Sequence, residues 1–228
     1  LHPVAHSFPT RRSSDLARFS KYGGRYRYRD PAVRRIARMI QDAGCEIGVH
    51  GAYHALDDAR AYRAQARSFE AAFGVRPAGI RNHYLRHNGE RTWRAQHEAG
   101  FEYDATFGFR DRIGVRDERY RPFFPLRESG DDAHAAFVAL PLTVMDSAVF
   151  RSMKLTAEQA LDACKRVALD VEERGGVLSL LWHNNYFDEP EFADWERVYE
   201  RLLAWLAERD PWNATGGQIA RQWKERAQ

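Results

Sequence analysis

The chain has 228 residues, a length typical of one folded domain of ordinary size. Hydrophobic residues make up 44% and charged residues 29% of the chain, a composition that supports a real core and excludes wholesale disorder. The formal net charge is only +3, with acidic and basic residues interspersed, which argues against a nucleic-acid surface, and no apolar run approaches the roughly 18 residues of a membrane span.

Residues 1–16 have a foreign character. His6 to Leu16 reads HSFPTRRSSDL, which resembles, letter for letter, one reading frame of a widely used DNA sequencing adapter. A natural polar, Arg- and Ser-rich leader is the alternative interpretation. We expect residues 1–16 to be non-native and exclude them from reasoning about the fold. On this interpretation the natural chain began earlier, and residues 17–228 form a single domain that is incomplete at its N-terminus.

Helices and strands alternate along residues 17–228. Asp30-Pro31 predicts a helix start, and Val33, Ile36 and Ile40 predict its apolar stripe. Further helices are expected at 59–73, 90–99, 156–174 and 191–208, the third opened by a capping box of Thr156 and Gln159. Strands are expected at 45–49, 78–82, 101–105, 137–142 and 177–182. Residues 107–136 are expected to be a long irregular excursion. The alternation predicts an α/β fold with a parallel sheet covered on both faces, although the pattern alone does not separate a barrel from an open sheet.

Polar side chains follow the predicted strands, where parallel barrels carry their active sites. They are His50, Arg81 to His83, Asp104, Asp146 and His183. His50 and His54 are four residues apart, a spacing that lets two imidazoles bind one metal ion, although the spacing alone is weak and one packing and one solvated His is the alternative. Asp104 and Asp146 are either functional carboxylates or simple caps.

Two further side chains are candidates for the chemistry. His183, at the mouth of a buried strand, suits general acid or base catalysis. Arg81 could pair with a catalytic carboxylate and fix its charge, or be an ordinary surface Arg. Asp57-Asp58 and Asp131-Asp132 are interpreted as solvated loop charges. The cysteines, Cys45 and Cys164, are interpreted as buried thiols without a disulfide, a weak lean towards a cytoplasmic location.

Five blocks of the chain resemble successive blocks of the polysaccharide deacetylase (NodB-homology) family. They are EIGVHGAYH at 46–54, RNHYLR at 81–86, FEYDAT at 101–106, LPLTVMD at 140–146 and LLWHN at 180–184. The resemblance covers about residues 19–210 and implies a distorted (β/α) barrel that removes acetyl groups from a carbohydrate. It also implies a divalent metal on His50 and His54, zinc first, with cobalt, nickel or manganese as alternatives, an Arg81 that orients the base, and a His183 that acts as the acid.

The resemblance also implies the partners and a missing part. The substrate is an acetylated carbohydrate, with His83, Tyr84, Asp104, Trp182 and Asn184 as its expected contacts; His83 and His87 could add metal ligands. The family's acidic block, which supplies a metal carboxylate and the base, finds no match upstream of Phe19, because Asp15 lies in the adapter-like segment and Asp30 caps a helix. We therefore expect a barrel without its first strand and an inactive polypeptide. The alternatives are a metal-dependent amidase acting on a small non-sugar amide and a non-catalytic carbohydrate-binding barrel.

Overall fold

The computed structural model describes residues 27–128, 136–187 and 190–227, and within them the chain forms two compact units. The first, the β1–β4 unit, contains the described residues of 27–107, 122–140 and 215–227. The second, the β5–β6 unit, contains those of 108–121 and 141–214. Each unit has its own parallel sheet and its own apolar core. The expected α/β class with parallel strands is confirmed.

The β1–β4 unit is built on a parallel sheet with the strand order β1-β2-β3-β4. The four strands are β1 (Val49–Gly51), β2 (Gly79–Asn82), β3 (Tyr103–Asp104) and β4 (Val138–Ala139). In register, His50 pairs with Arg81, and Ile80 pairs with Asp104. Because alternate residues of a strand point to opposite faces, His50 and Arg81 share one face, and Val49, Ile80 and Asp104 share the other.

Three helices supply the core on the Val49 and Ile80 face. They are α1 (Pro31–Asp42), α2 (Ala59–Phe73) and α3 (Glu90–Glu98). In α2, Tyr62 and Phe69 are fully buried, as their spacing predicts. In α1, the expected stripe is wrong at Ile36, which is 45% exposed, because Val33 and Ala37, four residues apart, are the buried pair.

The C-terminal helix α7 (Gly216–Glu225) covers the other face of this sheet and was not predicted from the sequence. The Glu46 carboxylate joins it to β3 by accepting hydrogen bonds from the Tyr103 hydroxyl, at 3.0 Å, and from the Gly217 amide, at 2.7 Å. The Tyr103 ring lies where a side chain at Gly79 or Gly216 would be: a Cβ there would come within 2.1 Å and 2.5 Å of it, respectively. Glycine at both positions therefore makes room for the tyrosine.

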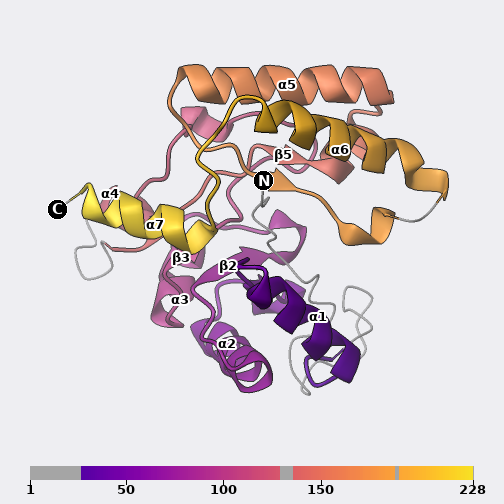
Figure 1. Ribbon diagram of the computed structural model, residues 1–228. Coiled ribbons are helices and arrows are strands. Elements are labelled where there is room, and N and C mark those ends of the chain that lie inside the picture. Colours follow the sequence, from indigo (N-terminus) through magenta and orange to yellow (C-terminus); the bar gives the residue numbers. More distant parts are fainter. Residues whose placement is uncertain (1–26, 129–135, 188–189, 228) are drawn as a thin grey trace. The chain divides into compact units, whose positions relative to one another are not determined.

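The β5–β6 unit has a two-stranded parallel sheet of β5 (Val144–Met145) and β6 (Leu180–Leu181). Two long helices run side by side in this unit, α5 (Ala157–Glu173) and α6 (Ala193–Ala207) (Figure 1). The expected capping box of Thr156 and Gln159 opens α5. Apolar side chains of both helices and of β5 form the core, including Leu161, Val198 and Leu202.

Short turns complete the two units. They are η1 (Tyr53–Ala55), η2 (His83–Leu85), η3 (Arg116–Glu118), α4 (Pro125–Glu128), the π-helical η5 (Ala148–Ser152), η6 (Asn184–Tyr186) and η7 (Pro190–Phe192). The strand expected at 137–142 is present but shorter, as β4, whereas β5 follows the expected range and lies in the other sheet. Residues 1–26, including the adapter-like segment, and Asp131-Asp132 lie outside the described residues. In the described part of the chain, no helix is both long and apolar enough to cross a membrane.

The two cysteines are thiols, as predicted: no disulfide is formed by either of them. Cys164 is fully buried in α5, and burial raises the pKa of its thiol to about 12. Cys45 is only half-buried, so the prediction of two buried thiols is wrong for this residue.

Candidate functional site

His183 and Asp146 form a hydrogen-bonded pair at the ends of the two strands of the β5–β6 unit. Asp146 directly follows β5, His183 lies two residues after β6, and Met145 pairs with Leu181 in register. The His183 Nδ1 lies 2.7 Å from Asp146 Oδ1. The Asp146 side chain is fully buried, whereas that of His183 is 31% exposed. The pair therefore presents an oriented imidazole to the surface of the unit.

The Asp146 carboxylate fixes this imidazole from several directions. Besides Nδ1 of His183, it accepts hydrogen bonds from the backbone amides of His183 and Ser147. Since an ionised carboxylate only accepts hydrogen bonds, Nδ1 must carry the proton in this pair, and Nε2 is the ring nitrogen left for chemistry. The sequence marked both residues as strand-end groups but gave no sign that they pair, because 37 positions separate them.

The neighbours of His183 in sequence have different surroundings. Trp182 packs its ring against Tyr199 of α6, with ring centroids 5.2 Å apart, and Phe150 lies 6.0 Å away. These contacts give Trp182 a packing role, and its predicted sugar contact stays a prediction. Asn184 is exposed at the start of η6, where a ligand could reach it. The Tyr186 ring lies 5.9 Å from that of His183.

Arg81, at the end of β2 in the β1–β4 unit, is a buried cation rather than a surface arginine. It is 2% exposed, and its Nε donates to the Ala105 carbonyl oxygen at 2.8 Å. Burial lowers the pKa of Arg81 to about 10, since desolvation disfavours the charged form; the nearby Asp104 carboxylate opposes this shift. The alternative of an ordinary surface arginine is wrong.

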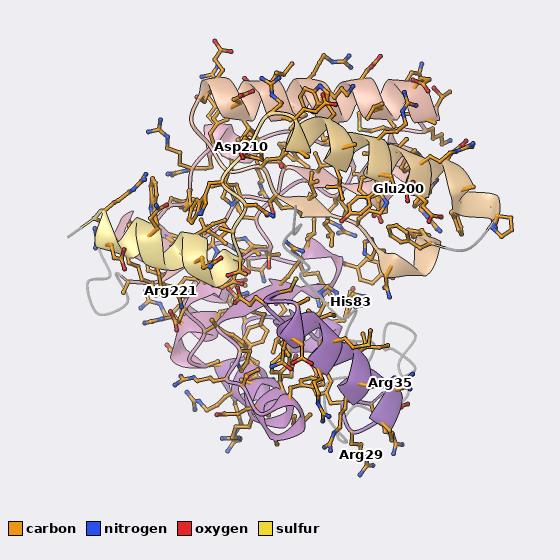
Figure 2. The ribbon with its side chains drawn as sticks, viewed as in Figure 1. Arg29, Arg35, His83, Glu200, Asp210 and Arg221 are labelled. Carbon is orange, nitrogen blue, oxygen red and sulfur yellow. The ribbon has the colours of Figure 1, made fainter. Side chains whose placement is uncertain are left out.

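A row of aromatic rings connects the histidines of this unit. The rings of His50 and His83 lie 5.0 Å apart, edge to face, and His83 contacts Tyr84 at 4.5 Å. Figure 2 marks His83 in η2, next to the end of β2. Tyr84 is 48% exposed with a φ of 57°, and it contacts Tyr53, which in turn contacts His54 at 5.1 Å. His83 thus lies beside His50, and Tyr84 lies beside His83; their predicted substrate contacts stay predictions.

The metal expected at His50 and His54 needs more donors than the described residues offer. Within 27–128, 136–187 and 190–227, no group of three or more His, Cys, Asp or Glu side chains is arranged to hold a metal ion. Catalytic zinc sites take three protein ligands. His87, considered as a further ligand, packs its ring against Trp93 at 4.4 Å. The described residues do not by themselves fit a complete metal centre, and no step below is derived through one.

Asp104 is a fully buried carboxylate whose oxygens are occupied. It accepts hydrogen bonds from Gln96 Nε2 at 3.0 Å, from the Thr106 amide at 3.1 Å and from the Thr106 hydroxyl, with the Trp93 indole nitrogen at 3.4 Å. These partners lie on α3 and in the turn after β3. They give Asp104 a structural role on the face of the sheet opposite to Arg81, and its predicted substrate contact stays a prediction.

The loop that carries His54 is fastened by Asp57, and the prediction that Asp57 is a solvated loop charge is wrong. The Asp57 side chain is 10% exposed and accepts hydrogen bonds from Asn88 Nδ2 at 2.7 Å and from the Thr92 hydroxyl at 2.5 Å. Asp58 is exposed, as predicted, but it also caps α2 by accepting from the Ala61 amide. The two partners of Asp57, Asn88 and Thr92, are 31 and 35 residues away in sequence. The sequence alone does not show that they contact Asp57.

We expect Asp57→Asn to lower the free energy of unfolding by about 1–3 kcal/mol, because the two carboxylate oxygens accept from Asn88 Nδ2 and from the Thr92 hydroxyl, and asparagine keeps only one acceptor oxygen. Asparagine tolerates the φ of 61° found at this position, so the change isolates the lost acceptor from backbone strain. Urea denaturation measures the effect. Asp58→Asn is the matched control, since Asn caps helices as well as Asp. An equal loss of stability in both variants would contradict the role of Asp57 in holding this loop.

Comparison with known proteins places this geometry in a known fold. No family model matches the sequence, and no curated protein matches it. Among solved structures, a protein assigned as a polysaccharide deacetylase from Mycobacterium smegmatis has a TM-score of 0.60 at 22% identity, covering 86% of this chain and 68% of that one. The chain has the polysaccharide deacetylase fold. The expectation drawn from the five sequence blocks is confirmed at the level of the fold.

Two other structures match this chain at lower similarity. The Xyl-CE4 domain of a multidomain xylanase from the hindgut metagenome of Trinervitermes trinervoides has a TM-score of 0.48 at 12% identity, covering 85% of this chain and 72% of that one. A family 4 carbohydrate esterase from Streptomyces lividans, in complex with acetate, has a TM-score of 0.43 at 14% identity, covering 77% and 68%. The structural argument for the deacetylase fold rests on the M. smegmatis protein.

Proposed function

We propose that this chain belongs to a carbohydrate deacetylase, a hydrolase that cleaves the C–N or C–O bond between an acetyl group and a sugar. The observation that carries the proposal is the His183–Asp146 pair, which lies at the strand ends of a chain with the deacetylase fold. An imidazole held by a buried carboxylate and reached by solvent suits proton transfer to a departing group.

His183 is the proposed general acid. To act as the acid, the ring must be in its cationic form, protonated from solvent at Nε2 while Nδ1 keeps its proton on Asp146. The Nε2 proton then passes to the sugar nitrogen or oxygen as the bond from that atom to the acetyl carbon breaks. Asp146 does not take that proton; it holds the ring and stabilises its cationic form. In the β1–β4 unit, His83 and Tyr84 are the proposed sugar contacts, and the Tyr84 ring is 48% exposed. In the β5–β6 unit, the exposed Asn184 is the proposed sugar contact.

Metal dependence belongs to the same proposal. His50 and His54 are the proposed ligands of a divalent ion, zinc first, whose chemistry would be to polarise the acetyl carbonyl and acidify a water molecule. The described residues supply neither a third ligand nor a carboxylate on Arg81 that could act as base. We therefore propose that residues 1–228 turn over substrate far more slowly than an enzyme with that acidic block.

Acetate release tests the proposal. Residues 1–228 are incubated with zinc or cobalt and an acetylated chitooligomer, and free acetate is measured with and without EDTA. We expect no release at enzyme-like rates. The same domain preceded by a strand that ends in Asp-x-Asp is expected to release acetate, to lose it in EDTA, and to fall by about 10²–10⁴-fold on His183→Ala.

The outcomes separate the alternatives. Enzyme-like acetate release by residues 1–228 would overturn the expected inactivity. If the extended form hydrolyses a small cyclic amide but no acetylated sugar, the amidase alternative holds. If it binds the oligomer without releasing acetate, the chain is a non-catalytic carbohydrate-binding barrel.

A further inference from the structure

Arg81 carries a buried charge with two unused donor groups. Its terminal nitrogens Nη1 and Nη2 are both buried, and neither has a hydrogen-bond partner among the described residues. Only Nε is engaged, with the Ala105 carbonyl oxygen. A guanidinium has five N–H donors and cannot discard its charge at neutral pH, so burial without an acceptor is costly.

The carboxylates near Arg81 are committed to other donors. Asp104 belongs to the opposite face of the sheet, where Gln96 and Thr106 occupy its oxygens. Glu46 accepts from Tyr103 and from the amide of Gly217 at the start of α7. In the part of the chain that the structure describes, neither terminal nitrogen of Arg81 is hydrogen-bonded to a carboxylate. The guanidinium is held by its position in β2 and by the hydrogen bond to Ala105. Its two terminal nitrogens are left to bind a ligand.

We propose that Arg81 is a binding site for a small carboxylate anion such as formate or acetate. The two terminal nitrogens present parallel N–H groups, the arrangement that binds the two oxygens of a carboxylate at once. Both nitrogens are buried, which favours an anion of few atoms. In such surroundings a charge-assisted pair gains more than it does in water, because the charge is already desolvated.

A thermal titration tests this site directly, and it does not rest on the proposed deacetylase activity. The melting temperature of residues 1–228 is followed with increasing sodium formate, against sodium chloride at equal ionic strength and against neutral formamide. We expect a rise that reaches a plateau with formate only, as ligand binding to the native state requires. Arg81→Met is expected to abolish the formate-dependent rise.

Arg81→Met also measures how much the buried, unpaired guanidinium destabilises the native state. Without any carboxylate, Arg81→Met is expected to melt at a higher temperature than the wild type, since it replaces a buried unpaired cation by an apolar side chain of similar length. Arg67→Met, on an exposed residue of α2, is the matched control and is expected to keep the wild-type response to formate.

Each result decides the question. A wild-type melting temperature that responds equally to formate and chloride overturns the carboxylate site, and so does a formate response that survives in Arg81→Met. If Arg81→Met does not fold, Arg81→Lys keeps the charge but loses the fork, and an unchanged formate response in that variant overturns the bidentate geometry. Loss or absence of acetate release in the deacetylase assay leaves these results unaffected.

Discussion

Asp146→Asn is expected to destabilise the β5–β6 unit by about 1–3 kcal/mol and to disturb the His183 ring. One oxygen of the carboxylate accepts from the His183 backbone amide, and the other accepts from the Ser147 amide and faces His183 Nδ1. Asparagine has one oxygen only, so either orientation of its amide places an NH₂ group against a buried backbone N–H. Urea denaturation measures the loss of stability.

The imidazole provides a second measurement for the same variant. Nitrogen chemical shifts of the ring are expected to show the proton on Nδ1 of His183 in the wild type and a substantial population with the proton on Nε2 in the variant. Asp170→Asn is the control, because Asp170 is a half-buried carboxylate of the same unit that bonds to Tyr120 and Arg174. An unchanged ring tautomer and unchanged stability in Asp146→Asn would contradict the assigned role of Asp146.

Gly79→Ala is expected to destabilise the β1–β4 unit by about 1–3 kcal/mol, the usual cost of overpacking a core. An added Cβ would come within 2.1 Å of Tyr103 Cζ, and Tyr103 is itself fully buried and hydrogen-bonded to Glu46. The ring can move only by breaking that bond or by displacing α7 at Gly216. Guanidinium denaturation measures the effect.

A double-mutant cycle separates this clash from the intrinsic effect of alanine in a strand. In a Tyr103→Leu background the obstructing ring is absent, so Gly79→Ala is expected to cost little or to stabilise, since alanine restricts the unfolded chain more than glycine does. If Gly79→Ala costs the same in both backgrounds, Tyr103 is not the reason for the glycine.

Local signals in the sequence predicted much of the fold. The Asp30-Pro31 start of α1 and the Thr156–Gln159 capping box are short-range patterns, and both occur as expected. The strands were harder, because their bounds depend on pairing: the apolar run at 177–182 yields only Leu180–Leu181 as paired strand. The helix α7 escaped prediction although Thr215 and Gln218 form a capping box of the same kind.

In the candidate site, too, the features set by local sequence were predicted and those set by tertiary contacts were not. The strand-end position of His183 and Arg81 follows from chain order, and the structure places both there. Their partners do not follow from it: the bond of His183 to Asp146 and the bonds of Asp57 to Asn88 and Thr92 join residues more than 30 positions apart. Such pairs depend on tertiary packing, which hydrophobic periodicity does not encode.

The late position of α7 in the chain has a consequence for biosynthesis. Its amide at Gly217 binds Glu46, so the sheet formed by residues 49–139 receives its covering helix only after the whole of the β5–β6 unit has been made. On the ribosome, the apolar side chains that α7 shields, among them Val138 and Leu140, stay uncovered until residues 216–225 have emerged. We expect the nascent β1–β4 unit to expose apolar surface, and with it a risk of aggregation, for as long as the β5–β6 unit is being made.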